Sequence, residues 1–188
     1  MSIQRSWKGM VFIATSLDGS IARPDGDISW LTDPPANPHH VPGEPGSNPP
    51  PGYDEFIVGV DHLVMGRRTY EKVLTFGFWP YADLQVLILS TTLARNTDGN
   101  VTVLASLDEV TRTLAANKAA GVYVDGGRVI QTFLSHDLID ELTISTAPIL
   151  IGGGLPLFGL LEHEIRVTHV GTSTSDTGMT SSRYAVIR

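Results

Sequence analysis

The sequence predicts an α/β fold in which a mainly parallel sheet lies between helices and carries an antiparallel edge. Short apolar runs alternate with helix-like segments through the middle of the chain, and two of these runs lead into a glycine and then a helix. The C-terminal part contains strand-like runs without a helical pattern. Alternation of this kind is typical of parallel β-α-β units, and two successive strands favour an antiparallel hairpin.

The first strand is predicted over residues 7–16, where residues 10–14 form an unbroken apolar run typical of a buried strand. A turn follows at residues 17–20, with the sequence Leu-Asp-Gly-Ser. Residues 21–30 are predicted to be a loop, because they contain a proline, a glycine and two aspartates.

A proline-rich insertion is predicted at about residues 33–52, which hold eight of the twelve prolines of the chain. No regular element survives at that density. Two interpretations stay open: a disordered surface insertion, or a lid or partner-contacting flap near a site. His39-His40 lies inside this segment without a clear third ligand and is interpreted as a solvated pair, so no metal site is predicted.

The middle of the chain alternates short strands with helices. In order, the predicted elements are a helix at 54–60, a strand at 62–65, a helix at 67–74, strands at 85–89 and 101–104, a helix at 106–120 and a strand at 122–124. Ser106 and Glu109 form a capping box at the start of the longest helix, and Gly121 is expected to stop it.

The C-terminal part is predicted to be β structure. Its expected elements are a strand at 142–147 closed by Pro148, an apolar and glycine-rich stretch at 149–159, and a hairpin of strands at 166–173 and 182–187.

Composition bounds the class of protein. With 188 residues and 41% hydrophobic content, residues 1–188 are predicted to form one globular domain. The net charge of −7 argues against a general nucleic-acid binder, and the absence of cysteine excludes disulfides, thiolate catalysis and cysteine-based zinc sites. No apolar stretch approaches the roughly 20 residues needed to cross a bilayer, and the N-terminal apolar run is too short for a signal peptide. A cytoplasmic protein is therefore expected.

The most informative segment is Tyr123-Val124-Asp125-Gly126-Gly127-Arg128, in which an apolar strand ends in an acid and two glycines. Apolar residues with helical spacing follow it. Two glycines let the backbone approach a ligand closely and leave amide N–H groups free at a helix N-terminus, which favours anions such as phosphate. The segment predicts a phosphate-bearing small-molecule ligand.

Two other predicted strand ends have compatible chemistry. Gly66-Arg67-Arg68-Thr69 repeats the glycine and helix start, and its arginines oppose the helix dipole unless an anion lies nearby. Taken alone, they are equally consistent with solvated surface residues. Ser90-Thr91 offers hydroxyl groups at a third strand end, and ligands of open α/β sheets bind at such ends. Neither G-x-G-x-x-G nor a P-loop is present, so an ordinary Rossmann domain or P-loop NTPase is not expected.

These segments also carry a family resemblance. Those that match, in the family's order, are residues 14–22 (Ala-Thr-Ser-Leu-Asp-Gly-Ser-Ile-Ala), 65–71 (Met-Gly-Arg-Arg-Thr-Tyr-Glu), 125–127 (Asp-Gly-Gly) and 138–142 with 147–154. The chain resembles the dihydrofolate reductase-like superfamily, and within it the reductase domain of the bifunctional riboflavin-biosynthesis enzyme and its free-standing relatives. The resemblance implies a three-layer α/β/α sandwich with a mainly parallel mixed sheet and an antiparallel C-terminal hairpin. It also implies a homodimer.

The resemblance assigns an NADPH site to this sequence. Arg67 would bind the 2′-phosphate, with Ser90 or Thr91 beside it. The remaining cofactor-binding residues that it implies are Ala14 and Ile21 on the nicotinamide side, Gly66, Arg68 and Thr69 by the phosphates, and Gly126, Gly127, Arg128 and Val129 around the pyrophosphate. Asp125, at the start of the glycine turn, is counted with them, and it either hydrogen-bonds backbone N–H groups of that turn or has a catalytic role. A non-proline cis peptide is implied as well, at Gly126–Gly127 or, if the alignment slips by one residue, at Asp125–Gly126.

The substrate side is less defined. The folate enzyme of this superfamily has a carboxylate soon after its first loop, and here Asp33 and Asp54 are the candidates. Asp18 either positions substrate or transfers a proton, or it forms an Asx-type turn with Gly19. Trp30 either covers the substrate pocket or packs in the core. Asp18, Asp54 and Trp30 are the predicted catalytic residues.

The predicted function is an NADPH-dependent oxidoreductase that passes hydride to a C=N or C=O bond of a small heterocycle, a pterin or a ribosylamino-pyrimidine. The alternative is a catalytically inactive NADP-binding regulatory protein. Neither nucleic acid nor a membrane is expected as a partner.

Overall fold

The computed structural model describes residues 5–32, 49–95, 97–161 and 163–188. Residues 33–48 of the predicted insertion, with Asp33 and His39-His40, lie outside the described residues. None of the helices in the described parts of the chain is long and apolar enough to cross a membrane.

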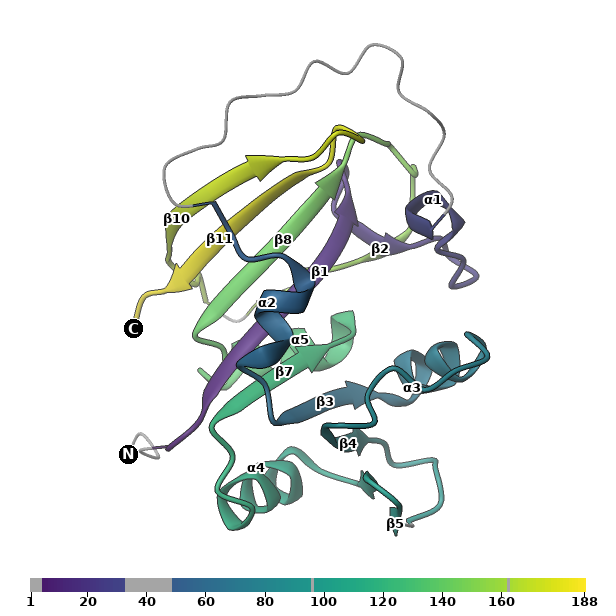
Figure 1. Cartoon of the computed structure of the whole chain (residues 1–188), viewed down its shortest axis with the longest axis vertical. Helices are drawn as coiled ribbons and strands as arrows, with labels where there is room; N and C mark the ends of the chain where they lie inside the picture. The colour runs from purple at the N-terminus through teal and green to yellow at the C-terminus, as the bar shows by residue number, and fades with distance from the viewer. Residues whose placement is uncertain (1–4, 33–48, 96, 162) are drawn as a thin grey trace.

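One mixed sheet forms the centre of the molecule (Figure 1). Its described strands, in spatial order, are β10 (Val167–Thr174), β11 (Thr180–Val186), β8 (Glu141–Ala147), β1 (Lys8–Ser16), β7 (Gly121–Asp125), β3 (His62–Gly66), β4 (Gln85–Leu89), β6 (Val101–Leu104) and β5 (Thr97–Asp98). The six strands from β8 to β6 run parallel to one another, whereas β11 and β10 form an antiparallel hairpin at one edge. The predicted sheet is therefore confirmed.

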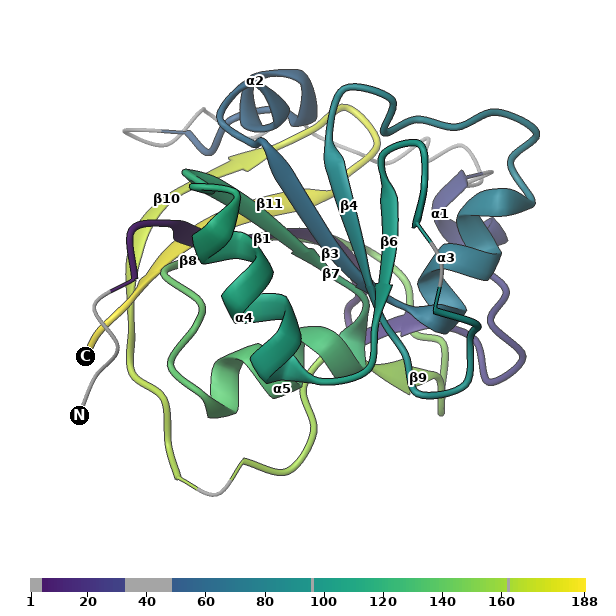
Figure 2. The ribbon, with the colours of Figure 1, turned by 90° about the horizontal axis from the view of Figure 1, so that it is seen from below.

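Helices cover both faces of this sheet. They are α1 (Ser29–Thr32), α2 (Tyr53–Val58), α3 (Arg67–Leu74), α4 (Leu107–Ala116) and α5 (Gly127–Ser135). Successive strand residues alternate between the faces, so Leu63 packs with α2 and α3, and its neighbour Val64 packs with α4 and α5. The result is the expected three-layer α/β/α sandwich (Figure 2).

The structure corrects two predicted stretches. Residues 21–30 are not only loop: β2 (Ser20–Ala22) pairs with β9 (Leu155–Pro156), and α1 follows. The predicted helix at 106–120 begins as expected, because the Ser106 hydroxyl accepts the Glu109 N–H (3.2 Å). It ends at Ala116 rather than near Ala120, because Lys118 has a positive φ of 56°, which takes the chain out of the helix before Gly121.

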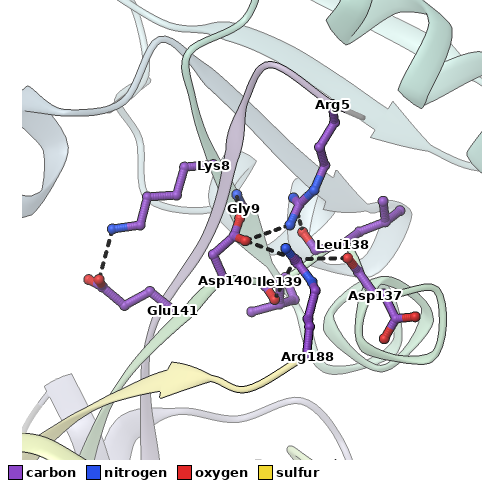
Figure 3. A network of polar contacts seen from close by, with 9 residues as sticks. All are labelled: Arg5, Lys8, Gly9, Asp137, Leu138, Ile139, Asp140, Glu141 and Arg188. Carbon is purple, nitrogen blue, oxygen red and sulfur yellow. Dashed lines mark hydrogen bonds and ion pairs between the residues drawn. The ribbon is translucent and has the colours of Figure 1, made fainter. Parts of the chain in front are cut away.

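A network of charges ties both ends of the described chain to the start of β8 (Figure 3). The Asp140 carboxylate accepts a hydrogen bond from Arg5 (2.7 Å) and from the Gly9 backbone N–H (2.8 Å), and it pairs with Arg188 at 2.8 Å. The Arg5 side chain is mostly buried and also donates to the Leu138 carbonyl (2.7 Å). Asp140 therefore joins β1 to both chain ends.

Replacing Asp140 with alanine is expected to lower the free energy of unfolding by about 2–3 kcal/mol, because it leaves a mostly buried guanidinium and a backbone N–H without their acceptor. Urea denaturation of the Asp140→Ala variant measures the change. Glu164→Ala is the matched control, since Glu164 pairs with Arg166 where both side chains are about four-fifths exposed, and its cost should stay below about 0.5 kcal/mol. Equal effects of the two changes would contradict this role of Asp140.

Candidate functional site

The parallel strands bring three predicted segments to one edge of the sheet. β7, β3 and β4 are neighbours, and their carboxyl ends carry Asp125, Gly66 and Leu89. α3 begins directly after β3, and a single residue, Gly126, separates β7 from α5. Two helix N-termini and the hydroxyl-bearing end of β4 therefore lie at the same edge, which is where open α/β sheets bind ligands.

Both helices start without a side-chain cap. Gly66 is the N-cap residue of α3 and Gly126 that of α5, and neither position supplies a side-chain oxygen to the first N–H groups. By contrast, α4 on the same chain is capped by Ser106. The first amides of α3 and α5 thus remain available as donors, and the helix dipoles add positive potential there.

Glycine lets the two helix starts come close together. A Cβ atom on Gly126 would collide with Oγ1 of Thr69, which belongs to the first turn of α3. A Cβ atom on Gly66 would stand 3.2 Å from Cγ2 of Val129, in the first turn of α5. The glycine pair and the segment 66–69, which are far apart in sequence, are therefore in direct contact, as the predicted site requires.

The predicted cis peptide is wrong, because both the Asp125–Gly126 and the Gly126–Gly127 bonds are trans. The chain turns into α5 by another route. Gly126 has φ +86° and ψ +131°, a backbone conformation that residues with a side chain rarely adopt.

Arg67 extends the site toward β4. Its Nε donates to Glu71 (2.6 Å), and its Nη1 donates to the Thr92 hydroxyl (3.0 Å). The buried Ser90 hydroxyl accepts the Thr92 N–H at 3.2 Å and lies 3.3 Å from the Thr92 hydroxyl. Ser90 lies directly after β4, and the hydroxyl that contacts Arg67 belongs to Thr92 rather than to Thr91, although both threonines are exposed. The hydroxyl run continues to position 92, which is the signal that identifies Thr92.

The remaining predicted cofactor residues surround the same edge. Arg68 and Arg128, in the first turns of α3 and α5, are exposed and make no ion pair with any carboxylate of the described residues. Ile21 of β2 packs against the start of α5, since a Cβ atom on Gly127 would stand 3.1 Å from its Cδ1. Ala14 is half-buried on β1, two residues before the strand ends.

Asp18 holds two loops together. Its carboxylate accepts hydrogen bonds from the Ser16 hydroxyl (2.5 Å) and from the N–H groups of Ile151 (3.1 Å) and Gly152 (2.8 Å). These bonds, that of Ser16 first, lower the pKa of Asp18 to about 2. Asp18 is thus ionised at neutral pH and fastens the turn after β1 to the glycine-rich loop before β9.

The other two predicted catalytic residues, Trp30 and Asp54, differ in their burial. Trp30 of α1 is buried, with 4% of its surface exposed, and its indole Nε1 has no hydrogen-bond partner in the described structure. Asp54 is exposed in the first turn of α2, a position where a carboxylate stabilises the helix dipole.

Asp125 is the carboxylate that the structure places deepest at this edge. It is half-buried at the end of β7, and one of its oxygens accepts the Gly126 N–H at 2.8 Å. Burial raises the pKa of Asp125 to about 6, although the Gly126 bond acts in the opposite direction. Tyr53, Tyr81 and Tyr123 lie within reach of its charge, which helps to raise the pKa of each of them. No sequence pattern marks Tyr53 or Tyr81 as neighbours of Asp125.

The fold and this edge define an α/β protein of the dihydrofolate reductase-like class. The chain matches the family described as "RibD C-terminal domain" over residues 8–181, and it belongs to that family. The relationship expected from the sequence motifs is confirmed.

Known proteins of similar sequence and structure agree with this assignment. The protein YwjB of Bacillus subtilis (strain 168) is 36% identical over 169 residues, which cover 88% of this chain and 90% of that protein. A crystal structure from Shewanella sp. PV-4, whose name connects it with riboflavin biosynthesis, has a TM-score of 0.80 and 38% identity over 96% of this chain and 99% of that one. Dihydrofolate reductase from Enterococcus faecalis, complexed with NADP(H), has a TM-score of 0.63 and 17% identity over 96% and 97% of the two chains, and it shares the fold.

Proposed function

We propose that this protein is an NADPH-dependent reductase of a small nitrogen heterocycle. The observation that carries the proposal is the contact between two uncapped helix starts, at Gly66 and Gly126, at the carboxyl edge of a parallel sheet. Two such starts side by side suit a pyrophosphate, which has two negatively charged groups a few ångströms apart. Membership of the RibD C-terminal domain family supports the same class of reaction.

The residues present fit NADPH along its length. The first N–H groups of α3 and α5 would hold the pyrophosphate, with Arg68 and Arg128 as the nearby cations that have no carboxylate partner in the described chain. The guanidinium of Arg67, with the hydroxyls of Ser90 and Thr92, would hold the 2′-phosphate, because a planar fork of donors matches a phosphate.

When bound, NADPH supplies the hydride, that is, the two electrons of the reduction. This chain supplies the position and surroundings of the reacting groups. Ile21 presents apolar surface beside the start of α5, and the half-buried Ala14 on β1 would offer a small side chain on the nicotinamide side. Asp18 keeps its charge near neutral pH and orders the adjoining loops, so it acts by positioning.

Arg67→Ala is expected to weaken NADPH binding roughly 10- to 100-fold, because a charge-assisted, forked pair with a phosphate is lost. NADH lacks that phosphate, so its affinity should change by less than about threefold. Isothermal titration calorimetry with both nucleotides measures the difference. Arg112→Ala is the matched control: Arg112 is an exposed arginine on α4 whose Nε donates to the Asp108 carbonyl (3.2 Å), away from the proposed site, and both affinities should stay unchanged.

An equal loss for NADPH and NADH would refute the 2′-phosphate role of Arg67. A wild-type protein that binds neither nucleotide would refute the proposed function. NADPH oxidation with a panel of pterins, aminopyrimidines and quinones then separates the enzyme from the alternative, because a catalytically inactive NADP-binding regulatory protein binds the nucleotide without turnover of any of them.

A further inference from the structure

The side chain of Gln131 joins α5 to the segment that contains β9 (Figure 2). Its Nε2 donates to the Leu157 carbonyl at 2.9 Å and, over a longer distance of 3.4 Å, to the Pro156 carbonyl. The carboxamide lies in space that the missing side chain of Gly159 leaves open, since a Cβ atom there would stand 2.6 Å from Oε1 of Gln131. Both acceptors are backbone oxygens, so a side chain at position 131 can bond to them only if it carries a donor.

β2 and β9 form a two-stranded ribbon, the β2–β9 ribbon, that rests directly on the first residue of α5. A Cβ atom on Gly127 would stand 3.1 Å from Cδ1 of Ile21 and 3.1 Å from the carbonyl oxygen of Pro156, and these atoms belong to different strands of the ribbon. Gln131 follows Gly127 by four residues, so the two lie on the same face of the helix. This face of α5 therefore contacts the ribbon at the helix start and holds it by hydrogen bonds one turn further along.

Leu157 connects the end of β9 to two other parts of the fold. Its side chain is buried, with 1% of its surface exposed, in the core that also contains Ile130 and Phe133 of α5. Its N–H donates to the Gly19 carbonyl (2.9 Å) in the turn after β1, and its carbonyl accepts the hydrogen bond from Gln131. The backbone of Leu157 thus bridges the turn after β1 and α5, and the α5 side of this bridge depends on Gln131.

The β2–β9 ribbon takes its position from these neighbours. It is a sheet of its own, separate from the nine-stranded sheet, and its register contains only two pairs, Ser20 with Pro156 and Ala22 with Leu155. A two-stranded ribbon of this size is not stable by itself in water. The place of Ile21, which lies between the two pairs on β2, is therefore set by the contacts of the ribbon with α5 and with the turn after β1.

We propose that Gln131 is a positioning residue, which bonds the end of β9 to α5 and thereby holds Ile21 on the nicotinamide side of the nucleotide site. The proposal rests on the proposed function, in which the starts of α3 and α5 hold the pyrophosphate and Arg67 holds the 2′-phosphate. Gln131 acts on the nicotinamide ring only through Ile21. The phosphate groups are held by other parts of the chain, so loss of the Gln131 hydrogen bonds should affect the two halves of the nucleotide differently.

Two ligands measure the two halves separately: NADPH, and 2′-phospho-ADP-ribose, which is the same molecule without the nicotinamide ring. Gln131→Met keeps the length of the side chain and removes its donor. Calorimetry should show that this variant binds NADPH roughly 3- to 10-fold more weakly than wild type, and 2′-phospho-ADP-ribose with an affinity changed by less than about twofold. The fluorescence of bound NADPH, which comes from the reduced nicotinamide ring, should shift toward that of NADPH in water.

A second variant and a control complete the test. Gln131→Glu places only acceptors opposite the two carbonyls, so it should enlarge the difference between the ligands. Ser135→Ala removes a hydroxyl that donates to the Thr132 carbonyl in the exposed last turn of α5, and it should change neither affinity. Binding of 2′-phospho-ADP-ribose also shows that each variant is folded.

The positioning role of Gln131 is overturned if both of its variants bind NADPH as wild type does, or if they lose affinity for NADPH and 2′-phospho-ADP-ribose equally. It is also overturned if Ser135→Ala weakens NADPH alone to the same extent. Wild-type protein that binds neither ligand would instead overturn the proposed function.

Discussion

Replacing Gly126 with alanine is expected to lower the free energy of unfolding by about 2–4 kcal/mol and to abolish NADPH binding. Two effects add. The backbone of Gly126 has φ +86°, which costs energy for any residue with a Cβ atom. The added methyl group also collides with Oγ1 of Thr69, so the start of α5 must move away from the start of α3. Urea denaturation and calorimetry with NADPH measure the two consequences.

Gly77→Ala separates these two effects. Gly77 has φ +78° and no atom within 4 Å of an added Cβ, so this control carries the backbone cost alone, about 1 kcal/mol. Adding Thr69→Ala to Gly126→Ala should recover part of the lost stability, because it removes the atom that the methyl group meets. Equal destabilisation by Gly126→Ala and Gly77→Ala would show that the two helix starts do not constrain each other.

Asp125→Asn is expected to raise the free energy of unfolding at pH 8 by about 1–3 kcal/mol, because a half-buried carboxylate whose pKa is raised is replaced by a neutral amide. Burial raises the pKa of Asp125 from 3.8 to about 6. Between pH 4 and pH 6, therefore, Asp125 stays protonated in the folded protein, whereas it has lost its proton in the unfolded chain. The resulting stability is complete below about pH 4 and is lost as the pH rises through 6. Wild type and variant should thus differ little at pH 4 and most above pH 6.

Urea denaturation of both proteins between pH 4 and pH 8 measures this divergence. The groups that face Asp125 are Tyr53, Tyr81 and Tyr123, whose pKa values are raised above 10, so they stay neutral over that range. Asp18 supplies a control whose pKa is shifted in the opposite direction. Its pKa is lowered to about 2, so its contribution is present above pH 4 and is lost only as the pH falls toward 2. Asp18→Asn should therefore destabilise the protein at pH 7. A pH-independent difference between wild type and Asp125→Asn would contradict the raised pKa.

Local sequence pattern was sufficient for most of the sheet. β4 occupies residues Gln85–Leu89 as predicted, because a strand buried on both faces is an unbroken apolar run between polar residues. β2 and β9 were missed, since strands of two or three residues have no periodicity of their own and exist only because they pair. α4 ends earlier than predicted for a similar reason. Its last turn is followed by Lys118 in the left-handed conformation, and the sequence has no glycine at that position to indicate it.

In the candidate site, too, the features set by neighbouring residues were predicted and those set by tertiary contacts were not. The glycine-led starts of α3 and α5 were predicted because a free helix N-terminus depends on adjacent residues alone. Thr92 and the tyrosines around Asp125 were not predicted, because their place depends on which segments come together. Tyr53 lies on α2 and Tyr81 lies after α3, yet the Asp125 charge helps to raise the pKa of both hydroxyls.

The amino-acid sequence by itself determined the class of this protein: the order of strands and helices, the two glycine-led helix starts and the arginine beside them. These features follow from interactions among residues a few positions apart, so they can be recognised in the printed chain. Only the tertiary structure decided the surroundings of Asp125. The pKa of a carboxyl group depends on the water that distant segments remove, here α2 and the segment before β4, whose tyrosines lie within reach of the Asp125 charge.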